Sequence, residues 1–173
     1  MFGWKRGRKA EPLRTAEQIR YLVLAAQREG NRQLTAAFSP LGLTPAQSEA
    51  LRILEDHGPL ALKQLGEMLV CDSGSSPSRI VDRLVAAGFV RKDPDEYDQR
   101  QLSLRLTPEG ADAAKAVRQI EDAMYSAIDT AVDAADSEVL LRTLRALTQG
   151  SPAGTALDNR LAAPHGDASG TSR

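Results

Sequence analysis

Hydroxyl side chains and cations gather between residues 75 and 83, where the sequence reads SSPSRIVDR. Pro77 suits the first position of a helix, and Ser76 suits the residue that caps it. Hydroxyls and free amides at a helix N-terminus can hold a phosphate, and an arginine there can reach the edge of a guanine. The alternative is that Ser76 only caps the helix and Arg79 is only a solvated charge. The candidate contacts to duplex DNA in this segment are Ser75, Ser76, Ser78, Arg79 and Arg83.

A second charged segment follows, with Arg91 and Lys92 ahead of the loop DPDEYDQR. Arg100 ends this loop, and an arginine gains free energy in a narrow minor groove from the negative potential there. Asp98 lies two residues earlier, where it can pair with Arg100. One alternative is an exposed ion pair, which contributes at most about 1 kcal/mol. For Arg91 and Lys92 the choice is between phosphate contacts and solvated strand charges.

Apolar spacing places two short helices ahead of a β-hairpin. The first spans LKQLGEML and puts leucines on one face, and the second begins at Ser76-Pro77 and ends at Gly88. Strands FVRK and LSLRL around the eight-residue loop form the hairpin, and the leucines of LSLRL share one side. Helix, turn, helix and hairpin in this order predict a winged helix. The expected apolar positions are Leu62, Leu65 and Leu69, then Ile80, Val81, Leu84 and Val85, then Leu102, Leu104 and Leu106.

Longer helices flank this unit. Residues 13–38 have helical apolar spacing, with a weak point at Gly30-Asn31. Thr44 and Gln47 form a capping box ahead of a helix that ends at residues 57–59. Thr107-Pro108 starts a long helix, and Asp136-Ser137-Glu138 restarts a last one.

The long helix carries small apolar residues that step by four and three without a break, as in closely packed helices. The winged helix is too short to cover the apolar stripes of its flanking helices, so we expect a second copy of the chain to cover them across a two-fold axis. Such a dimer presents two recognition helices to half-sites about one DNA turn apart. The candidate dimer residues are Ala113, Val117, Ile120, Met124, Leu140 and Leu144.

Three motifs resemble the MarR family of bacterial transcriptional regulators: RIVDRLVAAGFVRK at 79–92, Asp98-Gln99-Arg100, and LTPEG at 106–110. The resemblance runs from about Leu13 to Gln149, and the wing departs from the family's usual consecutive arginines at Gln99. It implies a triangular dimer, an Asp98 that holds Arg100 in place, and a small-molecule pocket between the dimer helices and the winged helix. The candidates for that pocket are Tyr21, Ala25, Leu51, Leu54 and Met124.

The predicted fold is mainly α with a small β-hairpin wing, that is, a winged helix-turn-helix inserted in a helical dimerisation domain. We expect a flexible basic N-terminus at 1–12 and a dimerisation helix within 13–43. The DNA-binding winged helix then occupies 44–110, and dimerisation helices occupy 111–149. Residues 150–173 are rich in Ser, Gly, Pro and Ala and are expected to form a flexible tail.

Composition limits the class of protein. A chain of 173 residues, 42% of them hydrophobic, can bury a single core. No apolar run approaches the ~18 residues of a membrane span, and the basic start has no apolar stretch behind it, so no signal peptide is expected. The formal net charge of −1 requires the cations of a DNA-binding surface to act locally.

Motifs for catalysis are absent from the sequence, which has no nucleophile–base pairing, no glycine-rich phosphate loop and no Cys/His cluster at ligand spacing. We therefore expect no enzyme, no cofactor and no metal site. His57 and His165 are the only histidines. A zinc site formed by His57 and neighbouring carboxylates is the weaker alternative to a histidine that satisfies helix-terminal carbonyls.

Cys71 is the only cysteine, which excludes an intramolecular disulfide and fits a reducing cytoplasm. It lies in the loop that enters the recognition helix, with no adjacent Lys, Arg or His to lower its pKa. Peroxide-sensing members of the MarR family use a cysteine in the first helix, where this chain has none. We therefore expect a buried or inert thiol, and the alternative is a redox switch.

These observations predict a cytoplasmic, homodimeric, sequence-specific DNA-binding transcriptional regulator, in its simplest form a ligand-responsive repressor of a pseudo-palindromic operator. Its partners would be double-stranded DNA, a second copy of the chain and a small-molecule effector, with no membrane partner. One alternative is a winged helix that binds another protein, which the polar side chains of Ser78, Arg79 and Arg83 disfavour. The other is a regulator that is switched through Cys71.

Overall fold

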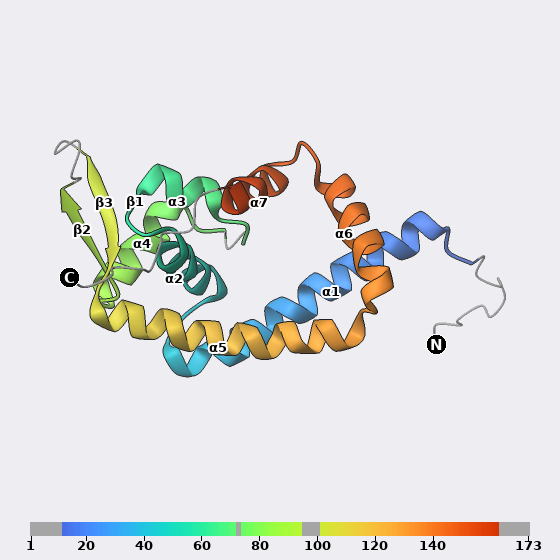
Figure 1. The fold of residues 1–173 in the computed structure, drawn as a ribbon, viewed down its shortest axis with the longest axis horizontal. Coiled ribbons are helices and arrows are strands. Elements are labelled where there is room, and N and C mark those ends of the chain that lie inside the picture. The colour runs from blue at the N-terminus through green and yellow to red at the C-terminus, as the bar shows by residue number, and fades with distance from the viewer. Residues whose placement is uncertain (1–11, 72–73, 95–100, 163–173) are drawn as a thin grey trace, which may run out of the picture. The chain divides into compact units, whose positions relative to one another are not determined.

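The computed structural model describes residues 12–71, 74–94 and 101–162 (Figure 1). The chain divides into two compact units, residues 1–34 and 35–173, and each is described by itself. Nearly all of the described part of the first unit belongs to helix α1, Thr15–Phe38. No helix within the described ranges is long and apolar enough to cross a membrane.

Helix α1 continues through Gly30-Asn31, where the sequence predicted a weak point. A glycine inside a helix costs roughly 0.5–1 kcal/mol relative to alanine, and contacts beside it offset this cost. Arg32 donates to the Glu29 carboxylate at 2.6 and 2.9 Å, and Gln33 donates to it at 2.8 Å. The Arg32 guanidinium lowers the pKa of Glu29 to about 2. The helix is therefore bridged across its glycine.

The second unit contains a helical core, a small sheet and three helices after the sheet (Figure 1). The sheet is antiparallel, with strand order β1-β3-β2. Helices α2 to α4 and the β2–β3 hairpin form a winged helix-turn-helix, so the predicted fold class is confirmed. The elements are η1 Ser39–Leu41, α2 Pro45–His57, β1 Leu60–Ala61, α3 Leu62–Met68, α4 Pro77–Ala86, β2 Val90–Pro94, β3 Leu102–Leu106, α5 Pro108–Ala131, α6 Ala134–Thr148 and α7 Pro152–Ala162.

Strand β1 has only two residues, which is too few to show a strand period, and it was not predicted. It pairs Leu60 with Leu104 and Ala61 with Ser103 of β3. Because β3 is thus the central strand, Ser103 and Leu104 are both buried, whereas Leu102 is 54% exposed. Of the leucines predicted to share one side of this strand, only Leu104 is fully covered.

The wing strands pair from Val90 with Leu106 to Pro94 with Leu102. Strand β2 therefore runs two residues beyond the predicted FVRK segment, and the loop starts later than expected. Pro94 is tolerated because β2 is an edge strand, where a proline need not remove an internal ladder bond.

The core of the second unit lies around α2, which contacts α3, α4, α5 and β3. Burial of one large aliphatic side chain stabilises the fold by about 1.5–3 kcal/mol. The predicted stripes are confirmed in their centres, but Val85 is only half-buried and Leu62 is 38% exposed. The least exposed large apolar side chains are Phe38, Leu51, Ile53, Leu65, Val81, Leu84, Leu104 and Val117.

The capping box predicted at the start of α2 is confirmed. Thr44 Oγ1 accepts from the Gln47 amide at 3.3 Å, and Gln47 Oε1 accepts from the Thr44 amide at 2.9 Å. The helix ends at His57, as the sequence indicated, and Gly58 follows it.

Thr107 starts α5 and ties it to the end of α4. Its Oγ1 accepts from the Gly110 amide at 2.9 Å and donates to the Gly88 carbonyl at 2.7 Å. Gly110 lies so close to the Phe89 carbonyl that there is no room for a Cβ. The helix start predicted from Thr107-Pro108 is confirmed, and the structure adds that it is held against the turn that ends α4.

The C-terminal helices differ from the sequence prediction. Helix α6 begins at Ala134, with Asp133 as its cap and its Oδ1 accepting from the Ala135 amide at 3.1 Å, so the restart expected at residues 136–138 is wrong. The flexible tail expected from residue 150 is also wrong as far as residue 162, because α7 forms there and contacts α3. Residues 163–173 and 1–11 lie outside the described part of the chain.

Candidate nucleic-acid interface

Helix α4 has one buried face and one exposed polar face. Its apolar stripe packs into the core and fixes the orientation of the helix, as described above. Ser78, Arg79, Asp82 and Arg83 are all exposed, as predicted. This arrangement presents two cations and a hydroxyl on the side of α4 that faces solvent.

The N-terminus of α4 lies where the sequence placed it, with Ser76 as the cap residue and Pro77 in the first turn. The Ser76 hydroxyl makes no capping bond to the backbone, and instead its Oγ lies 2.9 Å from Ser78 Oγ. The first amides of the helix are therefore not satisfied by their cap side chain. Such amides and paired hydroxyls can bind an anionic oxygen. Ser75, the preceding candidate, is half-buried.

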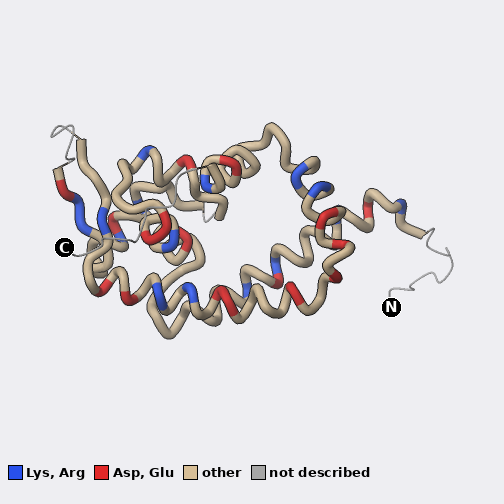
Figure 2. Tube along the Cα trace, in the orientation of Figure 1, with Lys and Arg blue, Asp and Glu red and all other residues tan. Residues whose placement is uncertain are grey.

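Acidic side chains bind the cations of the wing. Lys92 Nζ lies 2.7 Å from Asp82 Oδ1, which links strand β2 to the exposed face of α4. Asp93 binds Arg91 at 3.1 Å and Arg105 at 3.6 Å. Figure 2 shows that strand β2 carries both basic and acidic positions. The positive charge predicted for Arg91 and Lys92 is thus partly neutralised within the subunit.

Arg79 and Arg83 differ from these wing cations. Among the described residues neither of them forms an ion pair, and both are exposed. Asp98 and Arg100, the candidates at the tip of the wing, lie outside the described residues, so their predicted roles stay predictions.

A charge network that the sequence analysis missed joins α2 to α5. Arg52 is only 8% exposed and donates to Glu121 of α5 at 2.9 Å, to Asp56 at 3.2 Å and to Glu55. Arg118 of α5 donates back to Glu55 at 2.8 Å and to Asp56 at 3.0 Å. Burial raises the pKa of Glu121 in spite of the neighbouring Arg52. The i,i+3 and i,i+4 spacing of Arg52 with Glu55 and Asp56 was the signal in the sequence.

The residues predicted for a ligand pocket are spread over both units. Leu51 and Leu54 are buried in the core around α2, and Met124 of α5 is half-buried. Tyr21 and Ala25 are exposed on α1, in the other unit. The pocket therefore stays a prediction of the resemblance.

The predicted dimer residues fall into two groups. Val117 is completely buried within the subunit where α5 packs on α2, so its prediction as a dimer contact is wrong. The physical reason is that the first half of α5 uses its apolar face for the core of its own subunit. Ala113, Ile120 and Met124 are half-buried, whereas Leu140 and Leu144 of α6 are exposed.

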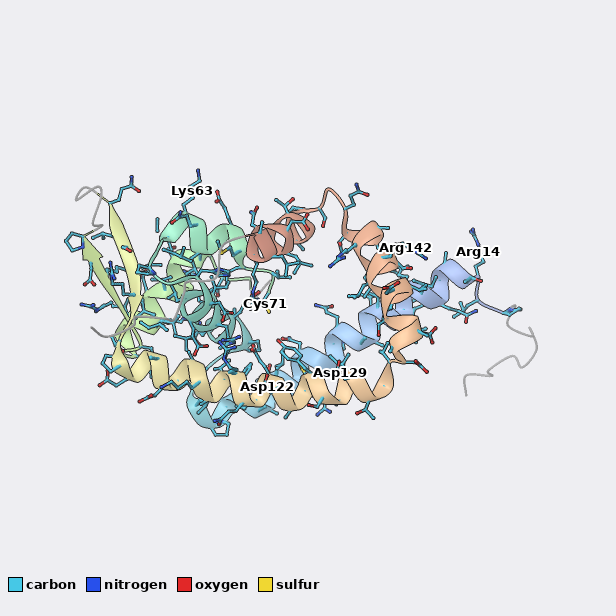
Figure 3. The ribbon with its side chains drawn as sticks, in the orientation of Figure 1. Arg14, Lys63, Cys71, Asp122, Asp129 and Arg142 are labelled. Atoms are coloured by element: carbon cyan, nitrogen blue, oxygen red, sulfur yellow. The ribbon has the colours of Figure 1, made fainter. Side chains whose placement is uncertain are left out.

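Cys71 is exposed in the loop after α3 (Figure 3), so of the predicted buried or inert thiol the buried alternative is wrong. Its thiol is nevertheless in a poor environment for a thiolate. Loss of solvent around the sulfur and then the charge of Glu49 raise the pKa of Cys71 to about 12. The thiolate is the reactive form, so this shift supports the prediction of an inert thiol. Within the described ranges no group of His, Cys, Asp and Glu could hold a metal ion, and His165 lies outside them.

Comparison with known proteins places this fold. Residues 43–102 match the model of the MarR family. The organic hydroperoxide resistance transcriptional regulator of Bacillus subtilis (strain 168) is 25% identical over 140 residues, which cover 70% of this chain and 95% of the relative. The multiple antibiotic resistance protein MarR of Salmonella typhimurium is 30% identical over 90 residues, covering 52% of this chain and 62% of the relative.

Solved structures share the same architecture. A MarR mutant from E. coli in complex with operator DNA matches with a TM-score of 0.65 at 24% identity, covering 75% of this chain and 93% of that chain. BpsR of Bordetella bronchiseptica, whose DNA binding is regulated by 6-hydroxynicotinic acid, matches with a TM-score of 0.68 at 20% identity, covering 81% and 99%. The family consists of transcriptional regulators and not of enzymes. Residues 43–102 are thus a match to the MarR family, and the curated relatives and the shared fold extend the similarity to MarR-type transcriptional regulators over most of the chain.

Proposed function

We propose that this regulator binds a pseudo-palindromic DNA operator in the cytoplasm as a homodimer, and that a small-molecule effector releases it, so that it acts as a repressor. The observation that carries the proposal is the exposed face of α4, where Arg79, Arg83 and Ser78 are held outward by a buried apolar stripe. The MarR–operator complex supports this use of the fold.

Recognition would begin at the N-terminus of α4. An α-helix fits the major groove of B-DNA, where the donor and acceptor pattern of each base pair is distinct. Arg79 lies in the first turn of α4 and would read a guanine, while Ser76 and Ser78 would hold the phosphates beside it. Arg100 of the wing would enter the adjacent minor groove, where groove width and not base identity is the signal.

The weak overall charge of the chain, −1, makes non-specific binding weak. Phosphate contacts supply essentially all of the sequence-independent affinity, and each neutralised phosphate makes that affinity more dependent on salt. With Lys92 and Arg91 paired to acidic residues, Arg79 and Arg83 are the main cations without an ion pair on α4 and the described part of the wing. We therefore expect binding to depend on the base contacts of α4.

The homodimer is supported by the apolar surface of α6, where Leu140, Leu144 and Leu147 are exposed. Effector control is supported by relatives of the same fold, since the organohalide-sensing regulator RdhR was also solved with 2,4-dichlorophenol bound. An effector releases DNA when it binds more tightly to the dimer geometry that does not fit both half-sites.

The test is an operator library titrated by fluorescence anisotropy, built on the sequence that the protein protects in a genomic footprint. Arg79→Ala should lose about 1–3 kcal/mol of operator binding and relax the preference at one base position in each half-site. Arg100→Ala should weaken binding mainly by reducing discrimination between A·T-rich and G·C-rich flanks. The control is Lys115→Ala, since Lys115 is an exposed cation on α5 that pairs with Asp112 at 3.4 Å.

Wild-type affinity in both Arg79→Ala and Arg100→Ala would contradict this mode of DNA reading. A winged helix that binds another protein would then be the better interpretation. Equal losses in Lys115→Ala would show that the library measures only general charge.

A further inference from the structure

The carboxylate of Glu49 lies at a junction of three segments that are far apart in the sequence. Glu49 belongs to α2 and is only 7% exposed. Its Oε1 accepts from the Val70 amide at 2.9 Å, and its Oε2 accepts from the Cys71 amide at 2.8 Å. Arg160 of α7 donates from Nη1 to Oε1 at 3.2 Å. One buried charge therefore binds both the loop that leads to α4 and the C-terminal helix.

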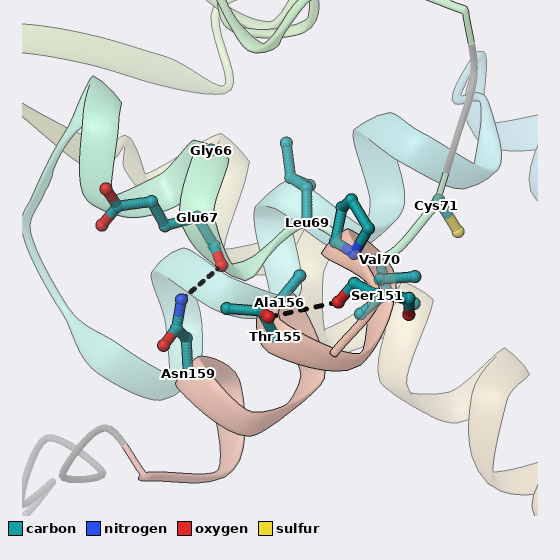
Figure 4. Close-up of a pocket in the computed structure, with 11 residues that line it drawn as sticks. Gly66, Glu67, Leu69, Val70, Cys71, Ser151, Thr155, Ala156 and Asn159 are labelled. Carbon is teal, nitrogen blue, oxygen red and sulfur yellow. Dashed lines mark hydrogen bonds between the residues drawn. The ribbon is translucent and has the colours of Figure 1, made fainter. Parts of the chain in front are cut away.

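A second contact joins α7 to the helix-turn-helix. Asn159 Nδ2 donates to the carbonyl of Glu67 at 3.0 Å (Figure 4). That carbonyl is one of the last four of α3, which have no partner inside their own helix. Asn159 and Arg160 are adjacent in α7, so two neighbouring side chains hold the end of α3 and the loop after it.

The two polar contacts lie beside an open groove. A cavity of about 650 Å³ lies between α3 and α7 (Figure 4), and its walls include Leu69, Val70 and Ala156. Gly66 lines the same cavity and lies against the Pro77 ring at the start of α4. Displacement of α3 would therefore reach the recognition helix.

The corner between α6 and α7 fixes where α7 starts. Ser151 Oγ accepts from the Gly154 amide at 3.1 Å and donates to the Thr148 carbonyl at 2.7 Å. Gly154 approaches the Thr148 carbonyl so closely that there is no room for a Cβ. Local contacts thus stabilise the start of α7, and Asn159 and Arg160 hold the helix against α3 and the loop after it.

We propose that α7 is a functional part of the winged helix-turn-helix. Arg160 and Asn159 are then positioning residues, which hold the loop before α4 and the end of α3 in the conformation that binds the operator. The proposal rests on the proposed function, because it assigns these residues a part in DNA binding. Hydrogen bonds weaken steeply with misalignment, so a small shift at the N-terminus of α4 would affect both base and phosphate contacts.

Cys71 provides a direct reporter of this loop, because it is the only cysteine in the chain. At pH 8 its thiol should be alkylated slowly, since its pKa is raised to about 12. Loss of the Arg160 charge alone would slow alkylation further, because Arg160 lowers the pKa of Cys71. Release of the loop would speed it, because the partial loss of solvent around the sulfur and the charge of Glu49 are the larger effects, and both raise the pKa of Cys71. Slower alkylation therefore indicates loss of the Arg160 charge alone, and faster alkylation indicates release of the loop.

The experiment measures the iodoacetamide alkylation rate of Cys71 and the operator Kd for full-length wild type, Arg160→Ala, Arg160→Lys and Asn159→Ala. We expect both Arg160→Ala and Asn159→Ala to speed alkylation. Arg160→Ala should raise Kd roughly tenfold, the loss for one disturbed charged contact, and Asn159→Ala should raise it less, because its hydrogen bond is neutral. Arg160→Lys should recover part of both effects. Asp158→Ala is the matched control, since Asp158 is an exposed charge on the same helix. Circular dichroism and sedimentation should show unchanged helix content and assembly in all variants.

Unchanged or slower alkylation in both alanine variants would overturn the proposal, and so would faster alkylation with a wild-type Kd. If the wild-type protein itself fails to bind any operator, the proposed function fails. Faster alkylation in the variants would then still show that α7 holds the loop. The two failures are therefore distinguishable.

Discussion

At the scale of single residues, the surface proposed to bind DNA carries an acidic group of its own. Asp82 shares the exposed face of α4 with Arg79 and Arg83, and its carboxylate binds Lys92 at 2.7 Å. The pair is largely exposed, so it adds little stability. Its main effect is to occupy a cation that a phosphate could otherwise use.

We expect Asp82→Asn to tighten operator binding and to steepen its salt dependence by about one unit on logarithmic scales, because Lys92 becomes available to a phosphate. Lys92→Ala should weaken binding about equally on all sequences. Kd measured between about 50 and 200 mM salt checks both variants. The matched control is Asp112→Asn, which releases Lys115 on α5. Weaker binding by Asp82→Asn would instead mean that the pair holds the wing against α4.

At the scale of elements, a buried charge network adds to the apolar packing that joins α2 to the long helix α5. Arg52 serves three carboxylates from one planar guanidinium, which a lysine could not do. Arg118 belongs to the same network but its side chain is 45% exposed. Substitution of each arginine therefore compares the contribution to stability of a buried cation with that of a solvated cation in the same network.

Arg52→Ala should lower the free energy of unfolding by about 3–5 kcal/mol, because it leaves Glu121 buried without its cation. Arg118→Ala should cost less than about 1 kcal/mol, since solvent screens it. Urea unfolding measures both. Arg52 lowers the pKa of Glu121, so its loss raises that pKa further above the ordinary 4.5. The Arg52→Ala protein should therefore lose stability as pH rises through the folded pKa of Glu121. Equal losses for the two variants would contradict this account.

At the scale of the whole molecule, exposed apolar side chains gather on two helices, α1 and α6. The leucines of α6 at 140, 141, 144 and 147 are between 38% and 61% exposed. Exposed apolar patches of this kind typically mark contacts with another protein. Val117 lies inside the core, so the exposed leucines of α6 are a better place to test the proposed dimer than the first half of α5.

Leu144→Glu should dissociate the dimer and weaken operator binding, because a single half-site lacks the gain from two linked contacts. Sedimentation equilibrium at micromolar concentration measures the assembly. Leu102→Glu is the matched control, since Leu102 is an exposed leucine on the wing. A wild-type protein that is monomeric and folded under these conditions would refute the homodimer, and dissociation by Leu102→Glu would show that the effect is not specific to α6.

The sequence alone was sufficient wherever the deciding contacts lie within one turn of the chain. The capping box of Thr44 and Gln47, the Thr107 cap and the two faces of α4 were all predicted and found, because caps and faces depend on residues three or four positions apart. Helix α7 carried the same kind of signal. Ser151-Pro152-Ala153-Gly154 repeats the pattern of Thr107-Pro108-Glu109-Gly110, but the Ser, Gly, Pro and Ala composition of the tail obscured it.

Only the tertiary structure shows which element packs against each helix face and each strand edge. The sequence showed an apolar stripe on α5, and only packing on α2 determined that Val117 belongs to the core of its own subunit. Strand β1 exists because β3 offers it an edge, and Arg160 meets Glu49 across 111 positions of chain. No local pattern encodes such contacts, because they depend on where the folded chain brings distant segments together. The contact of α7 with α3 and with the loop before α4 is of this kind.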